Sequence, residues 1–132
     1  MNKFASLIII LGLIACNSES GYHKAEDAQD AGREFIRASL DGNYRKALFY
    51  LYKDSSGANM MVFQKWKKEH DLLPQEEKIN YKDASIRAIK IENLNDSVVN
   101  YIYSNSYKPS VTTTIKVVKI NNEWLVDLKD IH

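Results

Sequence analysis

The sequence predicts an α+β domain in which helices precede a curved, four-stranded antiparallel sheet. Between about residues 25 and 78, apolar residues recur at a spacing of three and four, which is the period of amphipathic helices. After Tyr81 the apolar period changes to two, which is the period of half-buried strands. Because the helices come before the strands and not between them, we expect about three helices packed on one face of the sheet.

The first two helices are expected at residues 25–40 and 44–52. Ala28, Phe35 and other apolar residues share one side of the first, and Gly42 just beyond it favours a left-handed cap. Asn43 is well placed to cap the start of the second helix.

A third helix is expected at residues 59–70, with Phe63 and Trp66 on one side. Pro74 favours the start of a short further turn over residues 75–78. Trp66 lies within the run Lys65-Trp66-Lys67-Lys68, so this segment either buries the indole and leaves the lysines solvated, or binds anionic headgroups.

Four strands are expected at residues 84–91, 97–105, 111–119 and 124–128. The alternation slips by one residue after Ala88 and again at Val118, and such slips predict β-bulges and a bent sheet. Asn121 and Asn122 tolerate the positive backbone angles of a tight hairpin.

The alternation also predicts which side chains face the helices. Asp127 falls on the opposite face, so we expect it to be solvated. The expected concave surface consists of Val99, Tyr101, Tyr103, Val111, Thr113, Ile115, Trp124 and Val126.

The N-terminal residues 1–15 are typical of a secretory signal. Lys3 precedes the apolar residues 4–13, a stretch shorter than the ~20 residues that a membrane-spanning helix needs. The following Leu13-Ile14-Ala15-Cys16 resembles the lipobox of bacterial lipoproteins. This resemblance implies that Cys16 becomes the first residue of the mature protein and carries the two or three acyl chains that a stable anchor requires. The alternative is an ordinary cleaved signal that leaves Cys16 as a spare thiol.

Three segments are therefore expected: the lipoprotein signal peptide at 1–15, the lipidated cysteine with a flexible tether at 16–23, and one domain at 24–132. In well-studied Gram-negative lipoproteins, an aspartate after the cysteine favours retention in the inner membrane. Asn17 stands at that position here, so the resemblance implies a lipid-anchored protein of the bacterial cell envelope, in the outer membrane.

Two segments of the domain, FIRASLDGNYRKA at residues 35–47 and INNEWLV at residues 120–126, resemble small bacterial lipoproteins of the nuclear transport factor 2-like superfamily. The first is similar to the opening helix pair of that superfamily, and the second to its closing hairpin. The resemblance implies a cone-shaped α+β fold. It does not extend to the ketosteroid isomerases and dehydratases of the superfamily, because no acid and base pair is recognisable on the expected pocket strands.

Charge and histidine content exclude several classes of protein. Removing residues 1–15 takes away Lys3 and leaves equal numbers of basic and acidic side chains, whereas nucleic-acid binders usually carry a clustered basic surface. His23 and His132 are too far apart in sequence to suggest a metal site, so no metal or other cofactor is expected. His70, between Glu69 and Asp71, is expected to be an ordinary surface residue with a favoured imidazolium form.

Tyr101, Tyr103 and Trp124 are the candidate ligand-binding residues, because large amphipathic rings either fill a core or line a ligand cleft. The leading hypothesis is a non-catalytic, membrane-anchored domain that binds a small apolar ligand or another envelope protein.

Two alternatives stay open. One is a small hydrolase, isomerase or dehydratase that uses pocket tyrosines and an acid such as Asp127. The other is a subunit that pairs through the outer sheet face carrying Asn100, Thr112 and Thr114.

Overall fold

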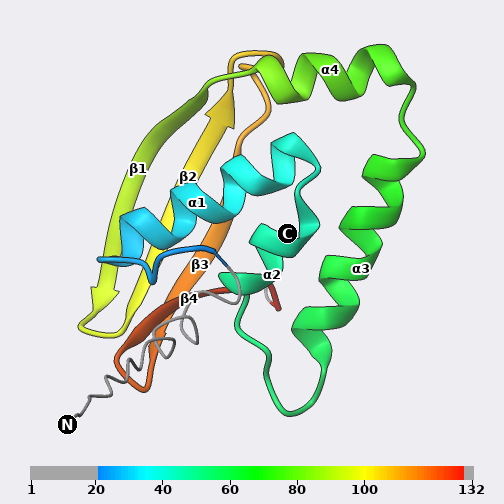
Figure 1. Cartoon of the computed structure of the whole chain (residues 1–132). Helices are drawn as coiled ribbons and strands as arrows, with labels where there is room; N and C mark the ends of the chain where they lie inside the picture. Colours follow the sequence, from blue (N-terminus) through cyan, green and yellow to red (C-terminus); the bar gives the residue numbers. More distant parts are fainter. Residues whose placement is uncertain (1–20, 130–132) are drawn as a thin grey trace, which may run out of the picture.

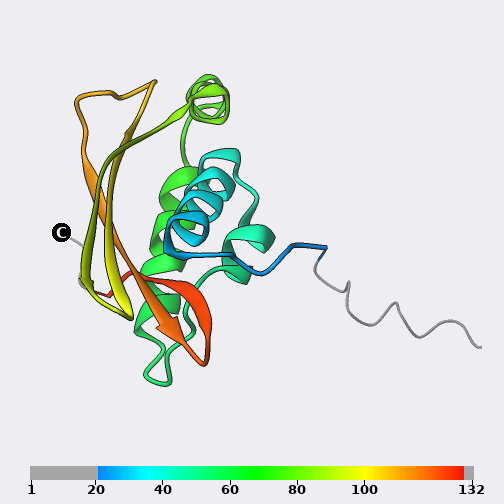
Figure 2. The same ribbon diagram turned by 90° about the vertical axis from the view of Figure 1, so that its left-hand side faces the viewer.

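The computed structural model describes residues 21–129, which form four helices followed by an open, four-stranded antiparallel sheet (Figure 1). Each strand pairs with the next one in the chain, in the order β1-β2-β3-β4. The helices lie on one side of the sheet (Figure 2). The α+β class predicted from the change of apolar period is therefore confirmed.

Helix α1 (Ala28–Asp41) is the helix that packs directly on the sheet. The carboxylate of Asp27 accepts the backbone N–H of Asp30 at 2.7 Å, so the helix begins three residues later than the expected 25–40. Gly42 ends it with a φ of 74°, the left-handed conformation that glycine adopts at little cost.

Helix α2 (Tyr44–Phe49) follows at once, and the side chain of Asn43 caps it by accepting the N–H of Lys46 at 3.2 Å. It ends before the expected residue 52 because the chain there joins the sheet. Leu51 forms a parallel bridge with Val126, whose N–H and C=O bond the Tyr50 carbonyl and the Tyr52 N–H, both at 2.8 Å.

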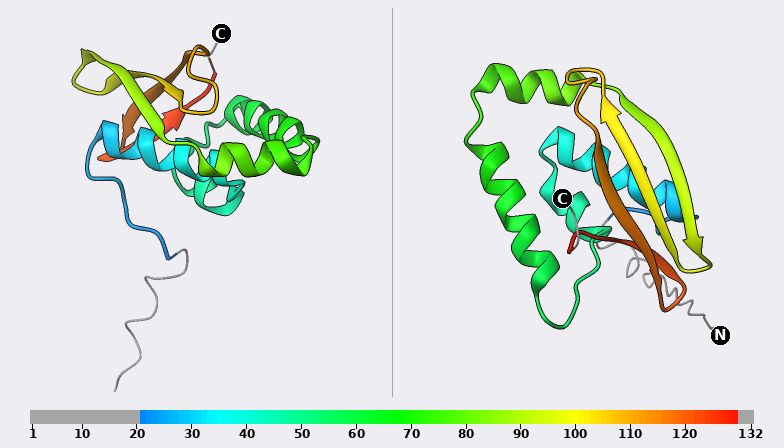
Figure 3. Two further views of the ribbon diagram at one scale, coloured as in Figure 1. Left: turned by 90° about the horizontal axis from the view of Figure 1, so that it is seen from above. Right: turned by 180° about the vertical axis from the view of Figure 1, so that it is seen from behind.

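Helices α3 (Ala58–Asp71) and α4 (Gln75–Asp83) lie at an angle to each other and extend beyond α1 (Figures 1 and 3). Asn59 ties α3 to the end of the sheet, since its fully buried Oδ1 accepts the N–H of Leu128 at 2.5 Å. Helix α4 is five residues longer than the expected turn. None of its residues is buried, so it has no apolar stripe from which its length could be predicted.

Strands β1 (Ile86–Asn95) and β2 (Val98–Asn105) form the first hairpin. Their register shifts between Ala88 and Lys90, which leaves Ile89 unpaired at the position where the apolar alternation slips. The predicted bulge is confirmed. A second shift lies between Asn93 and Asn95, in the stretch that was expected to connect the first two strands.

Strands β3 (Thr113–Ile120) and β4 (Glu123–Asp127) form the last hairpin, where Asn121 and Asn122 have φ values of 50° and 66° as expected. The predicted bulge at Val118 is wrong. Val118 pairs in register with both Val98 and Leu125, so it is an apolar side chain of the outer sheet face, buried among apolar partners.

The expectation that Asp127 is solvated is also wrong. This aspartate is buried at 8% exposure, and its carboxylate accepts the N–H of Lys129 at 3.1 Å and pairs with the ammonium of that residue at 3.6 Å.

The core lies between α1 and the inner sheet face. Helix α1 contributes small and large apolar residues at helical spacing, and these pack on alternate residues of β2, β3 and β4. Its fully buried members include Ala31, Phe35, Ile36, Tyr101, Ile115, Val117 and Val126.

Candidate functional site

A cleft of about 530 Å³ lies between the C-terminal half of α1, the helices α3 and α4, and the adjoining ends of β2 and β3. Its walls are mainly apolar and aromatic, which is typical of sites for small molecules. They include Leu40, Tyr44, Phe63, Trp66, His70, Leu73, Tyr81, Tyr103, Val111 and Thr113.

Aromatic packing holds the helical wall of the cleft. The ring of Phe35, buried in α1, lies 6.4 Å from that of Phe63 and 6.3 Å from that of Trp66, both on α3. Tyr44 meets Phe63 edge to face at 6.2 Å. These contacts fix α3 against α1 and α2 while Trp66 remains half-buried at the cleft surface.

A hydrogen-bonded polar group forms one end of the cleft. The Tyr44 hydroxyl donates to Asp71 Oδ1 at 2.9 Å and lies 2.6 Å from His70 Nδ1. Since the phenol has one proton, Nδ1 of His70 must be the protonated nitrogen if both bonds form together. Lys67 completes the group by pairing with Asp71 at 3.1 Å and covering the Tyr44 ring at 5.0 Å.

Burial shifts the acidity of these groups. It lowers the pKa of His70 from its usual 6.5, against the raising effect of Asp71. It also raises the pKa of Tyr44, and that of Tyr103 to about 12. The expectation of an exposed histidine with a favoured imidazolium is therefore corrected: His70 is half-buried, and Tyr44 and Gly42 lie against its ring.

The structure brings together two of the three candidate ligand residues, because the rings of Tyr101 and Tyr103 lie 6.1 Å apart, but it places Trp124 elsewhere. Tyr103 lines the cleft. Tyr101 is 2% exposed and fills the core beneath Gly32 of α1. Trp124 is half-buried on the helix-facing side, where it lines a separate depression with residues near the start of α1.

Trp66, His70 and Tyr81 are cleft residues that sequence reasoning did not assign to a site. Trp66 was expected either to be buried in the core or to belong to a segment that binds anionic headgroups. Neither interpretation included the observed arrangement, in which α3 forms one side of the cleft. Tyr81 lies where the apolar period changes, but nothing in that pattern indicates a cleft.

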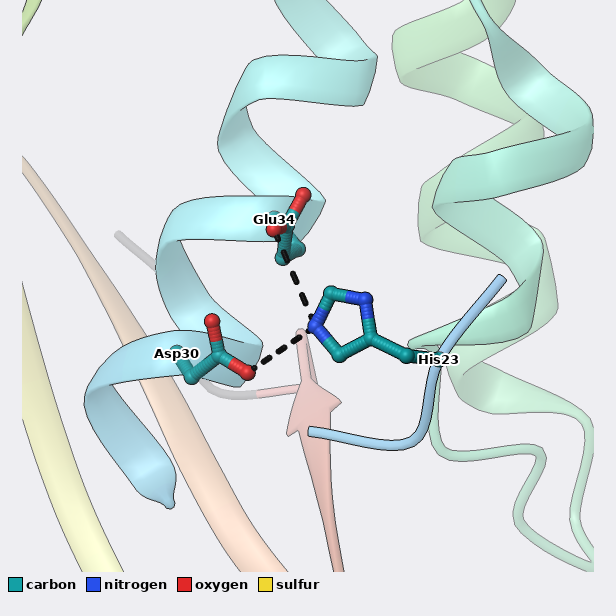
Figure 4. A group of neighbouring side chains, drawn as sticks. All are labelled: His23, Asp30 and Glu34. Atoms are coloured by element: carbon teal, nitrogen blue, oxygen red, sulfur yellow. Dashed lines mark hydrogen bonds and ion pairs between the residues drawn. The ribbon is translucent and has the colours of Figure 1, made fainter. Parts of the chain in front are cut away.

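A second group of titratable side chains lies at the start of the fold, where His23 faces Asp30 and Glu34 of α1 (Figure 4). His23 Nε2 is 3.3 Å from Asp30 Oδ2 and 4.0 Å from Glu34 Oε2. Sequence reasoning considered the spacing of histidines alone and therefore missed this group. The i, i+4 spacing of Asp30 and Glu34, which places both on one helix face, was the available sign.

The chain matches no family model, no curated protein and no solved structure. Among residues 21–129, no helix is long and apolar enough to cross a membrane. Residues 1–20, which include Cys16 and the lipobox-like motif, lie outside the described part of the chain.

Proposed function

We propose that this protein is a lipid-anchored lipoprotein of the bacterial envelope, in the outer membrane, whose domain binds a small, largely apolar ligand or protein segment without catalysing a reaction. The observation that supports binding is the aromatic-lined cleft of about 530 Å³, a volume within the range of small-molecule sites. The support for the anchor is the sequence Leu13-Ile14-Ala15-Cys16.

The polar groups of the cleft favour an apolar ligand because much of their bonding capacity is already used. Ser39 Oγ donates to the Phe35 carbonyl at 2.9 Å, and Asn105 Oδ1 accepts the N–H groups of Tyr107 and Lys108. Lys67 is paired with Asp71. A strongly polar guest would lose hydration without gaining equivalent partners, so affinity must come mainly from contact with the rings.

Val111 offers a direct test. It lines the cleft and is 55% exposed, so Val111→Asp introduces a charge there with little risk to the core. The uncharged dye N-phenyl-1-naphthylamine should bind the wild type, and Val111→Asp should weaken binding about tenfold because a desolvated carboxylate opposes an apolar guest. Dye fluorescence during a protein titration measures this.

Leu94→Asp is the matched control, since Leu94 is 54% exposed on β1 and does not line the cleft. It should leave dye binding unchanged. Quenching of Trp66 in a Trp124→Phe variant would then locate the dye. No binding by the wild type, or equal loss in both aspartate variants, would contradict the proposal.

The second candidate function is a small hydrolase, isomerase or dehydratase that uses the same cleft. The observation in its favour is His70, which lines the cleft and has a lowered pKa. Against it, Nδ1 is engaged by Tyr44, and Nε2 is buried without a hydrogen-bond partner among the described residues. Hydrolysis of p-nitrophenyl esters that is lost in His70→Gln would favour the enzyme, and equal rates would exclude His70 as its base.

A further inference from the structure

We infer that His23, Asp30 and Glu34 form a binding site for a divalent transition-metal ion such as Zn²⁺. The three side chains come from the segment that enters the domain and from two successive turns of α1 (Figure 4). They supply one imidazole nitrogen and two carboxylate oxygens, and these atoms all lie within 4.8 Å of one another. The site is separate from the cleft, so it does not depend on the proposed function.

The side chain of Tyr50 positions His23 before any metal binds. The Tyr50 hydroxyl donates to the His23 carbonyl oxygen at 2.7 Å, and the two rings meet edge to face at 6.3 Å. These contacts hold the imidazole with Nε2 pointing between the two carboxylates, as Figure 4 shows.

The carboxylates are also held in a suitable orientation. Arg33 bonds Asp30 Oδ1 at 3.0 Å, and Lys46 bonds Glu34 Oε1 at 2.7 Å. In each case the other oxygen is the one nearest His23, and Asp30 Oδ2 is further fixed by the Glu26 N–H at 3.0 Å. Outer-shell partners of this kind orient metal ligands.

The distances suit a tetrahedral ion after a small closure. Zn²⁺ bonds of about 2.1 Å place neighbouring ligand atoms about 3.4 Å apart. The separation of His23 Nε2 from Asp30 Oδ2 is 3.3 Å, and rotation of the Glu34 side chain shortens its 4.0 Å separation from Nε2.

The ligand set selects a class of metal. Imidazole suits zinc, copper and nickel, whereas Ca²⁺ takes six to eight oxygen ligands and Mg²⁺ prefers octahedral oxygen sites. The side chain of His23 is 56% exposed, so solvent reaches the site and a water molecule can fill the fourth position.

The test uses the full chain with Cys16→Ser, which removes its one thiol as a competing ligand. Zn²⁺ should bind with one-to-one stoichiometry and should raise the melting temperature. Mg²⁺ should not raise the melting temperature, and bound Co²⁺ should give a visible absorption spectrum. His23→Gln and Glu34→Gln should each weaken Zn²⁺ binding at least about tenfold, since each removes one of three protein ligands.

Glu26→Gln is the control, because it removes a neighbouring exposed carboxylate whose side chain is not part of the group. It should bind Zn²⁺ as the parent does. If Glu34→Gln fails to fold, His23→Gln decides, since His23 is the exposed member. Absence of binding at millimolar Zn²⁺, or unchanged affinity in His23→Gln, would overturn the inference.

Discussion

Gly32 leaves a space on α1 that the ring of Tyr101 occupies. A β-carbon at this position would lie 2.9 Å from Tyr101 Cδ2, closer than carbon atoms pack. Tyr101 is 2% exposed and belongs to the main core cluster, so its ring has little room to move away. The glycine therefore sets how closely this turn of the helix approaches β2.

Gly32→Ala should lower the free energy of unfolding by about 1–2 kcal/mol because overpacking the core costs more than the ~1 kcal/mol that alanine gains in a helix. Chemical denaturation of the purified protein measures the change.

The control is Gly32→Ala combined with Tyr101→Leu, because the second substitution removes the ring that obstructs the added methyl group. There the alanine should be neutral or stabilising, giving a double-mutant cycle with a clear coupling energy. Equal effects in both backgrounds would mean that the Tyr101 ring does not constrain the helix.

At the level of residues, the sequence predicted which face of the sheet a side chain lies on better than it predicted how far that side chain is exposed to solvent. The parity of Trp124 and Val126 placed both on the helix side, as the structure has them, because alternation follows from backbone geometry. The same alternation led to the expectation that Asp127 is solvated. That expectation is wrong because alternation gives the face of a side chain but not the neighbours that cover it. His23 was missed for a related reason: its partners depend on the path by which the chain enters the domain.

Asn59 joins two elements that are far apart in the chain, the start of α3 and the end of β4. The bond between its Oδ1 and the Leu128 N–H is buried, so removing the amide leaves that N–H without its partner.

Asn59→Ala should destabilise the fold by about 1–3 kcal/mol, the cost of a buried unsatisfied group. It should also speed hydrogen exchange at the Leu128 amide. Thermal unfolding and NMR exchange measure the two effects.

Gln64→Ala on the exposed side of α3 serves as the comparison, and it should change neither quantity appreciably. If Asn59→Ala behaved like Gln64→Ala, the amide would not be what holds α3 to the sheet.

At the level of elements, the outcome depended on whether a pattern had a single physical cause. The slip after Ala88 marks a true register shift, whereas the similar slip at Val118 marks an apolar outer face. Both produce neighbouring apolar residues, so periodicity alone does not separate them. The cleft is harder still to predict, because it depends on how α3 and α4 are placed relative to the sheet. No local pattern of apolar residues in the sequence specifies that placement.

For the molecule as a whole, the anchor is the prediction with the clearest test. Cys16→Ser should abolish incorporation of a clickable fatty acid in a bacterial host, because the acyl chains need the cysteine sulfur and its amine. In-gel fluorescence of the captured protein measures incorporation.

A matched variant moves the cysteine. Adding Ser18→Cys to Cys16→Ser keeps one thiol but displaces it from Leu13-Ile14-Ala15, so labelling should remain absent. Equal labelling of the wild type and Cys16→Ser would end the lipoprotein hypothesis and leave the cleft proposal intact.

The bridge between Leu51 and Val126 has a consequence for how copies of this protein behave when crowded. Exposed sheet edges are templates on which strands of other molecules add, the first step of β-aggregation. At one edge, the chain around Leu51 already bonds both backbone groups of Val126 in the five-residue strand β4. At the other edge, two register shifts interrupt β1. Neither edge offers a long regular ladder, so neighbouring copies concentrated on a surface would meet without a ready template for joining their sheets.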